Sequence, residues 1–396
     1  MDSTDLVNLE PIARVALLGL VLAAGPLAWV WARHRRADTP RRLQALTLLT
    51  LFLTFDLILF GAFTRLTDSG LGCPDWPGCY GHASPLGAHE DIHAAQTALP
   101  SGPVTFSKAW IEMIHRYLAT GVGVMITVLA IASWLQWRQD RARGRPSAVS
   151  PFWATATLVW VCVQGAFGAL TVTLKLYPAI VTAHLLGGLA LLCLLAVMSA
   201  QPRRGEVVVP AGLRRGLWVV ALLVLAQITL GGWVSTNYAV LACSDFPQCQ
   251  GRWWPVMDFQ QGFAILRPLG QGADGGGLPF EALVAIHMAH RIGALVVLTA
   301  LAWLAWRLWR EPGLRRMAAG VAAVASWQLA TGLSNVVLGW PLLAAVGHTG
   351  GSAALALLLT WLLVRTRATG ADPVPVAAPH GASGRLGRTQ PARAGS

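Results

Sequence analysis

Four histidines and four cysteines recur in matched places in the two halves of this 396-residue chain. Each half has a cysteine-bracketed loop, then an apolar segment that opens on a His-Arg pair, then an apolar segment that contains a lone histidine. The four histidines are His115, His184, His290 and His348. Histidine is the commonest metal ligand among side chains, and an ionisable residue inside an apolar span is by default a functional candidate. The repeat therefore indicates paired metal or haem sites.

The spacing within the two halves indicates an internal duplication. Gln164 lies twenty residues before His184, and Gln328 lies twenty residues before His348. The two cysteine-bracketed loops, CPDWPGC and CSDFPQC, also share one internal spacing. We therefore expect the two lone histidines to occupy equivalent places, and the histidines of the two His-Arg pairs likewise.

The predicted depth of these histidines favours a haem over a bare metal ion. His115, His184 and His348 lie five to six residues inside the outer end of their expected helices, which is about 8 Å at 1.5 Å per residue. His290 lies nine residues inside its own. Two histidines at one depth on two helices can ligate a planar macrocycle from both sides. For any one of them, the alternative is a hydrogen bond within a polar pocket. Neither half offers an obvious third ligand for zinc or copper, and the sequence has no CxxCH, the motif of covalently attached haem.

The two halves differ three residues before the histidine of the His-Arg pair. The first half has Glu112, on the same helical face as His115, and the second half has His287. A carboxylate beside a metal centre can act as a base or stabilise developing positive charge. Alternatively, Glu112 is a helix-start glutamate favoured by the helix dipole. His287 could be an interfacial residue or an alternative ligand to His290.

Arg116 and Arg291 complete the two His-Arg pairs. Each could bind a haem propionate near the outer surface, or instead a lipid phosphate or a loop carboxylate. Together with the difference between Glu112 and His287, the repeat suggests one reactive bundle and one electron-carrying bundle.

The cysteines are expected to form one disulfide in each loop. Five residues, among them a proline, lie between Cys73 and Cys79 and again between Cys243 and Cys249, so a tight turn could bring each pair within bonding range. Free thiols and a redox relay that cycles during turnover are the alternatives. Zinc is disfavoured, because two cysteines per loop fall short of the four ligands of a structural site.

Composition places the chain in a membrane. Hydrophobic residues make up 55% of it and charged residues only 12%, and many apolar runs approach the roughly 20 residues that cross a bilayer. Backbone groups in lipid must be satisfied within their own segment, so each span is expected to be a helix. The predicted spans are residues 12–32, 43–65, 110–136, 152–174, 178–200, 215–235, 281–307, 316–338 and 342–365.

These spans predict an all-α polytopic membrane protein made of two tandem pseudo-symmetric four-helix bundles plus an extra N-terminal transmembrane helix. Residues 1–42 would form that helix and a basic cytoplasmic loop, 43–200 the first bundle and 201–365 the second bundle. Residues 366–396 are rich in Pro, Gly, Ala and Arg and are expected to be a disordered basic cytoplasmic tail. Four-helix bundles commonly build cofactor sites from side chains on facing helices.

Basic residues predict the orientation, because short cytoplasmic loops carry an excess of Lys and Arg. The loops near 33–42, 138–145, 203–215 and 307–316 and the tail from 365 are basic, and they alternate with loops that are not. The N-terminus and both cysteine loops are therefore expected on the periplasmic side, and the C-terminus in the cytoplasm. The net charge of +12 then reflects topology and contact with anionic membrane lipid, with no nucleic-acid partner.

Three motifs of the first half, GAFTRLTDSGLGCPDWPGCYG, EMIHR and TAHLLGG, resemble those of the haem A synthase family of cytochrome oxidase assembly proteins. Less similar versions of these motifs in the second half extend the resemblance over about residues 45–365. It implies an enzyme of the bacterial inner membrane, a haem-dependent oxidoreductase that converts a methyl group of haem O into the formyl group of haem A. The conversion would proceed by successive hydroxylations followed by loss of water.

The resemblance also implies roles for the site residues. Haem O, the substrate, would be held in the first bundle by His115 and His184. A permanent haem b would be held in the second bundle by His290 and His348. Glu112 matches the acidic residue that the family places beside the substrate.

The cysteine pair Cys73 and Cys79 matches the family's loop pair for electron or haem delivery. The chain departs from the simplest family pattern in its extra first span, in its tail and in the second pair, Cys243 and Cys249. Because a structural disulfide would serve both loops equally, the second pair weakens a role confined to the first.

Two other classes stay open at the level of sequence, a non-catalytic haem carrier or chaperone and a di-haem membrane electron-transfer protein. All candidate ligands are expected near one face, which counts against electron flow across the membrane. The family implies a haem O synthase and cytochrome oxidase assembly factors as partners, and a homo-oligomer is compatible with the chain. The electron donor and the source of the oxygen atom are not defined by the sequence.

Overall fold

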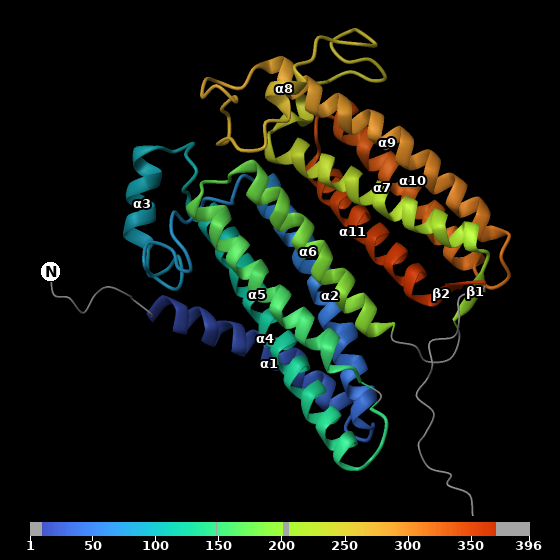
Figure 1. Ribbon diagram of the computed structural model, residues 1–396. Coiled ribbons are helices and arrows are strands. Elements are labelled where there is room, and N and C mark those ends of the chain that lie inside the picture. The colour runs from blue at the N-terminus through green and yellow to red at the C-terminus, as the bar shows by residue number, and fades with distance from the viewer. Residues whose placement is uncertain (1–9, 148, 201–205, 370–396) are drawn as a thin grey trace, which may run out of the picture.

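The computed structural model describes residues 10–147, 149–200 and 206–369. Within these ranges the chain forms nine long helices (Figure 1). They are α1 (Glu10–Arg33), α2 (Thr39–Leu66), α4 (Phe106–Ala142), α5 (Pro151–Thr173), α6 (Pro178–Ser199), α7 (Ala211–Thr236), α9 (Phe280–Trp309), α10 (Arg315–Val337) and α11 (Leu342–Arg365). Each coincides with one of the nine predicted spans, so the prediction of an all-α polytopic membrane protein is confirmed.

Eight of these helices are long and apolar enough to cross a membrane, judged over the described residues. The ninth, α10, is as long as α5 but falls short in hydropathy. It carries two arginines in its first turn and the buried polar side chains of Thr331 and Asn335 near its other end. It packs between α9 and α11, where polar side chains meet protein rather than lipid.

Local sequence explains where several helices begin. The Asp38 side chain caps α2 by accepting from the Arg41 amide, and Thr105 caps α4 by accepting from the Lys108 amide. Such caps satisfy backbone N–H groups that have no partner within the helix. Proline in the first turn of α2, α5 and α6 costs little there, because that position needs no N–H donor.

The first bundle consists of α2, α4, α5 and α6, with α1 packed along the outside of α4. Gly19 of α1 lies against Thr120 of α4, where a Cβ would overlap the threonine side chain. Close approach through small residues is a common way for helices to associate in lipid. The extra first helix is therefore docked on the bundle rather than standing free of it.

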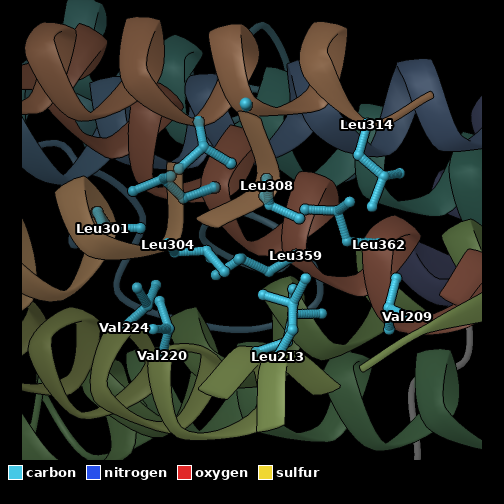
Figure 2. Close-up of a cluster of buried hydrophobic side chains, with 14 of the residues drawn as sticks. Val209, Leu213, Val220, Val224, Leu301, Leu304, Leu308, Leu314, Leu359 and Leu362 are labelled. Atoms are coloured by element: carbon cyan, nitrogen blue, oxygen red, sulfur yellow. The ribbon is translucent and has the colours of Figure 1, made fainter. Parts of the chain in front are cut away.

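The second bundle consists of α7, α9, α10 and α11. Figure 2 shows its apolar core, in which Leu213 and Val220 of α7 meet Leu301 and Leu304 of α9 and Leu359 of α11. These side chains are almost completely buried. The core fills the half of the bundle away from the cysteine loops, because the loop-side half carries the histidines.

The two bundles pack side by side through α2, α6, α7 and α11. Gly350 of α11 lies against Leu59 of α2, and Gly232 of α7 lies against Thr182 of α6. A Cβ built on Gly232 would be 3.1 Å from the Thr182 side chain. The hydroxyl groups of Thr182 and Thr236 share a hydrogen bond of 3.2 Å across the same contact. Small residues therefore allow close backbone approach between the bundles.

Two short strands, β1 (Val207–Val209) and β2 (Thr366–Ala368), pair in parallel at the end of the second bundle opposite the cysteine loops (Figure 1). Arg214 of α7 donates to the Thr366 carbonyl at 2.6 Å and to its hydroxyl at 2.7 Å. The prediction of a disordered tail from residue 366 is therefore wrong for its first residues, because strand pairing and Arg214 hold them. The rest of that predicted tail, from 370, lies outside the described residues.

The cysteine loops lie at one common end of the two bundles (Figure 1). The first continues into α3 (His89–Ala98), and the second contains η1 (Ala239–Leu241) and α8 (Phe259–Gly262). In the second loop, the buried Arg267 donates to Asn237 Oδ1 at 2.6 Å and to the Gln271 carbonyl at 3.0 Å. Burial lowers the pKa of this guanidinium. Arg267 therefore connects the long second loop to the C-terminal end of α7.

Candidate functional site: two histidine pairs below the cysteine loops

His290 of α9 and His348 of α11 face each other inside the second bundle. Their ring centres are 6.5 Å apart and their planes are inclined by 77°. Two imidazole nitrogens that share one metal ion, each about 2 Å from it, place the ring centres about 6 Å apart. The pair therefore has the separation of two axial ligands on one iron.

Polar partners hold these two rings. The Thr331 hydroxyl of α10 lies 2.9 Å from Nδ1 of His348. The Gln227 amide of α7 lies 3.0 Å from Nδ1 of His290 and donates to the His290 carbonyl at 2.9 Å. Each contact involves Nδ1, so Nε2 is the nitrogen of each ring that remains for a ligand.

His115 of α4 and His184 of α6 form the corresponding pair in the first bundle and lie within electrostatic reach of each other. The His115 ring stacks on Phe60 of α2, with ring centres 6.3 Å apart and planes inclined by 7°. Nδ1 of His184 is buried and has no hydrogen-bond partner among the described residues. A buried nitrogen without a partner is costly, so this ring is poorly satisfied by the protein alone.

A glycine on the neighbouring helix faces each of the four histidines. A Cβ built on that glycine would lie 3.1 to 3.6 Å from the nearest imidazole atom. The pairs are Gly61 with His115, Gly168 with His184, Gly231 with His290 and Gly332 with His348. Each bundle thus uses two helices to supply histidines and two to supply the glycines beside them. These glycines were not predicted from the sequence, although they recur with the same offsets as the cysteines and the lone histidines.

The donor set fits a haem. The described residues contain no group of three His, Cys, Asp or Glu side chains that could hold a metal ion. Two imidazoles are sufficient for a metal whose remaining ligands come from a macrocycle. The glycine beside each ring leaves room where a side chain would otherwise fill the bundle.

Glu112, one turn before His115, is buried and bound at both oxygens. Oε1 accepts from Arg116 at 2.6 Å, and Oε2 accepts from the backbone amide of Cys73 at 2.8 Å. The loop approaches this closely because Gly72 lies directly against the backbone of Lys108. Glu112 therefore connects the first cysteine loop to the helix that carries His115.

The two arginines bind the cysteine loops. Arg116 donates to the carbonyls of Asp75 at 2.9 Å and Gly78 at 2.5 Å. Arg291 donates to the carbonyls of Cys243 and Gln248, both at 2.9 Å. Both arginines therefore reach backbone carbonyls of the cysteine loops, and Arg116 also binds the Glu112 carboxylate. Binding of a haem propionate by either arginine stays a prediction.

His287 occupies the place of Glu112 in the second bundle. It is buried, and its Nε2 accepts from Arg291 Nε at 3.3 Å. This contact parallels the one between Glu112 and Arg116. Because the His290 ring is the one that faces His348, the geometry favours His290 over His287 as the ligand.

Both cysteine pairs are bonded, Cys73 to Cys79 and Cys243 to Cys249, and all four residues are completely buried. An aspartate closes the following turn in each loop. Asp245 accepts from the amides of Gln250 and Gly251, both at 2.9 Å. These hydrogen bonds, that of Gly251 first, lower the pKa of Asp245. Asp75 accepts from the amides of Tyr80 and Gly81 in the first loop.

A polar bridge joins the loop ends of the two bundles. Arg65, at the end of α2, donates to the Tyr238 hydroxyl at 2.8 Å and to the Ser235 carbonyl at 2.7 Å. Tyr238 donates in turn to Asp68, and Arg65 stacks over the Tyr238 ring at 4.2 Å. No sequence signal connected these residues, because they lie in different halves of the chain.

The fold and site define a class of protein: a polytopic helical membrane protein with two bundles, each with a histidine pair inside it. In the second bundle, the separation of the two rings suits two ligands of one iron. The family model of the cytochrome oxidase assembly proteins matches residues 44–361. The chain belongs to this family. The match begins within α2, so α1 lies outside it.

Curated relatives carry the name heme A synthase. The relative from Shewanella oneidensis is 39% identical over 316 residues, which cover 78% of this chain and 92% of the relative. The relative from Allorhizobium ampelinum is 27% identical over 378 residues, which cover 89% of this chain and 97% of the relative. The relative from Symbiobacterium thermophilum is 28% identical over 356 residues, which cover 85% of this chain and 100% of the relative.

Proposed function

We propose that this protein is a haem A synthase in which the first bundle binds the haem O substrate and the second bundle holds a resident haem b. Its family and its 39% identity to a heme A synthase over most of the chain support the reaction, an oxidation of haem O to haem A. The observation that carries the haem assignment is the facing pair His290 and His348, whose separation suits one iron between two imidazoles.

Glu112 supports the placement of the substrate in the first bundle. It is the buried carboxylate one turn from His115, and the second bundle has His287 at that place. Oxidation of a methyl group removes protons and electrons from its carbon, and a nearby carboxylate can accept a proton or stabilise positive charge there. A bundle without this carboxylate is better suited to carry electrons.

The residues of the first bundle would divide the work as follows. His115 and His184 bind and orient the substrate, and bound haem supplies redox chemistry that amino-acid side chains lack. Glu112 acts beside the methyl group. Arg116 holds the Glu112 carboxylate in place through its bond of 2.6 Å. The cysteine loop closes the outer end and excludes water.

We place the protein in the bacterial inner membrane, with both cysteine loops and the N-terminus periplasmic and the C-terminus cytoplasmic. The basic loops, which alternate with loops that are not basic, support this orientation. The oxidising periplasm would then maintain the two disulfides. Haem O synthase is the expected supplier of substrate, and an oxidase assembly factor the expected acceptor of product.

The decisive experiment is chromatography of haem extracted with acid-acetone from the purified protein, expressed with and without a haem O synthase. We expect haem B in both samples, and haem O, a hydroxylated intermediate or haem A only with the synthase. Haem B alone in both samples would exclude catalysis and favour an electron-transfer protein. Unchanged haem O as the only additional haem would favour a carrier.

A further inference from the structure

The two histidine pairs differ in how the protein holds the nitrogen that does not face the ligand site. In the second bundle, Thr331 donates its hydroxyl proton to the Trp327 carbonyl at 2.7 Å. Its oxygen, 2.9 Å from His348 Nδ1, is then an acceptor. The proton of His348 is thereby fixed on Nδ1, and Nε2 keeps the lone pair that binds iron.

The first bundle lacks this arrangement. Counted from the matched residues Gln164 and Gln328, each followed four residues later by its glycine, Phe167 stands where the second bundle has Thr331. A phenyl ring cannot accept the Nδ1 proton, and Nδ1 of His184 is buried without a partner among the described residues. The lack of a hydroxyl group at Phe167 therefore explains why Nδ1 of His184 has no hydrogen-bond partner among the described residues.

Within the part of the chain that the structure describes, the first bundle also lacks a polar partner for the histidine of its His-Arg pair. Leu57 stands four residues before Gly61, where the second bundle has Gln227 four residues before Gly231. The Gln227 amide contacts both Nδ1 and the carbonyl of His290 and so holds α9 against α7. An amide can present either a donor or an acceptor to Nδ1, whereas the role of Thr331 is settled by its bond to Trp327. Thr331 is therefore the residue on which the inference rests.

We propose that Thr331 is a positioning residue that makes the second bundle a permanent haem site, and that Phe167 leaves the first bundle a weaker site from which haem exchanges. A partner on the distal ring nitrogen fixes the tautomer and ring orientation of a ligating histidine and raises its basicity, and losing it typically costs about 10- to 100-fold in affinity. The inference deepens the proposed function, on which it rests. A substrate site must release its product, and a resident electron carrier must not be lost with it.

The test measures haem loss from the full-length purified protein to excess apomyoglobin. Thr331→Val is nearly isosteric but lacks the hydroxyl, and Thr331→Ser keeps the hydroxyl and is the matched control. We expect Thr331→Val to lose haem b about 10-fold faster or more, with Thr331→Ser close to the parent. The midpoint potential of this haem should rise in Thr331→Val, because a less basic imidazole stabilises the oxidised iron less.

The reciprocal variant is Phe167→Thr, made with a co-expressed haem O synthase. It supplies an acceptor to His184, and we expect haem O and haem A to leave the first site about 10-fold more slowly. Parent-like haem loss and an unchanged potential in Thr331→Val would overturn the inference. If Thr331→Val does not fold, an unchanged release rate in Phe167→Thr overturns it. A parent protein without haem B would instead overturn the two-haem function itself, so the two failures are distinguishable.

Discussion

The backbone amide of Cys73 donates a hydrogen bond of 2.8 Å to Glu112, so a disulfide-closed loop is attached directly to the helix turn before His115. Arg116 binds the other oxygen of the same carboxylate and also the carbonyls of the loop. Loop, carboxylate and ligand helix therefore form one connected unit. The position of Glu112 depends on the loop, and the position of the loop depends on Glu112.

Glu112→Gln is expected to lower haem A formation by at least about 100-fold, because an amide cannot take a proton or offset positive charge. Its oxygen can still accept from the Cys73 amide, so the loop contact is retained. Chromatography of extracted haem from the co-expressed protein would show haem O bound and little haem A. The matched control is Glu281→Gln, an exposed glutamate in the first turn of α9. Parent levels of haem A in Glu112→Gln would contradict the catalytic role.

Gly168→Val is expected to lower the haem content of the first bundle while the haem content of the second bundle stays unchanged. A Cβ at Gly168 already lies 3.6 Å from His184, and the added methyl groups of valine would displace the ring. Gly165→Val on the same helix is the matched control, because nothing lies within 4 Å of its Cβ position. The measurement is the ratio of haem O plus haem A to haem B per protein. An equal loss of all haems in Gly168→Val alone would indicate general misfolding instead.

The disulfides are expected to resist reduction in the folded protein. All four bonded cysteines are completely buried, and thiol–disulfide exchange requires access to the sulfur. Treatment with a reductant and N-ethylmaleimide should leave Cys73 and Cys243 unlabelled until the protein is unfolded, as peptide mass spectrometry would show. Rapid labelling of Cys73 and Cys79 in the folded protein, with the second pair protected, would favour a redox relay.

Tyr238→Phe is expected to lower the free energy of unfolding by about 1 kcal/mol, the typical net contribution of a hydrogen-bonded group. Its hydroxyl accepts from Arg65 and donates to Asp68, across the two bundles. Burial raises the pKa of Tyr238, so the hydroxyl keeps its proton. Denaturant unfolding in detergent would measure the change. In an Asp68→Asn background the effect should shrink, and equal effects in both backgrounds would exclude coupling through this bridge.

Much of the architecture could be predicted from the sequence, because lipid imposes a simple rule. Long apolar segments must become helices, so all nine predicted segments are helices in the described residues. Eight of them qualify as membrane spans, and α10 falls short because its two first-turn arginines and its polar side chains make it less hydrophobic. The tail was predicted less well. Thr366 and its neighbours carry no strong strand signal, and their pairing with residues 207–209 depends on a contact between distant parts of the chain.

The sequence by itself determined the duplication, the four histidines and which cysteines could pair, since each follows from residue type and spacing. Only the tertiary structure decided what these residues touch. It directed Arg116 and Arg291 to loop carbonyls, bound Glu112 to Cys73, and placed Thr331 beside His348 while leaving His184 without a partner among the described residues. Such contacts join helices that are far apart in the chain. A hydrogen bond requires its donor and acceptor to be placed to within a fraction of an ångström, and the spacing of residues along the sequence cannot specify this.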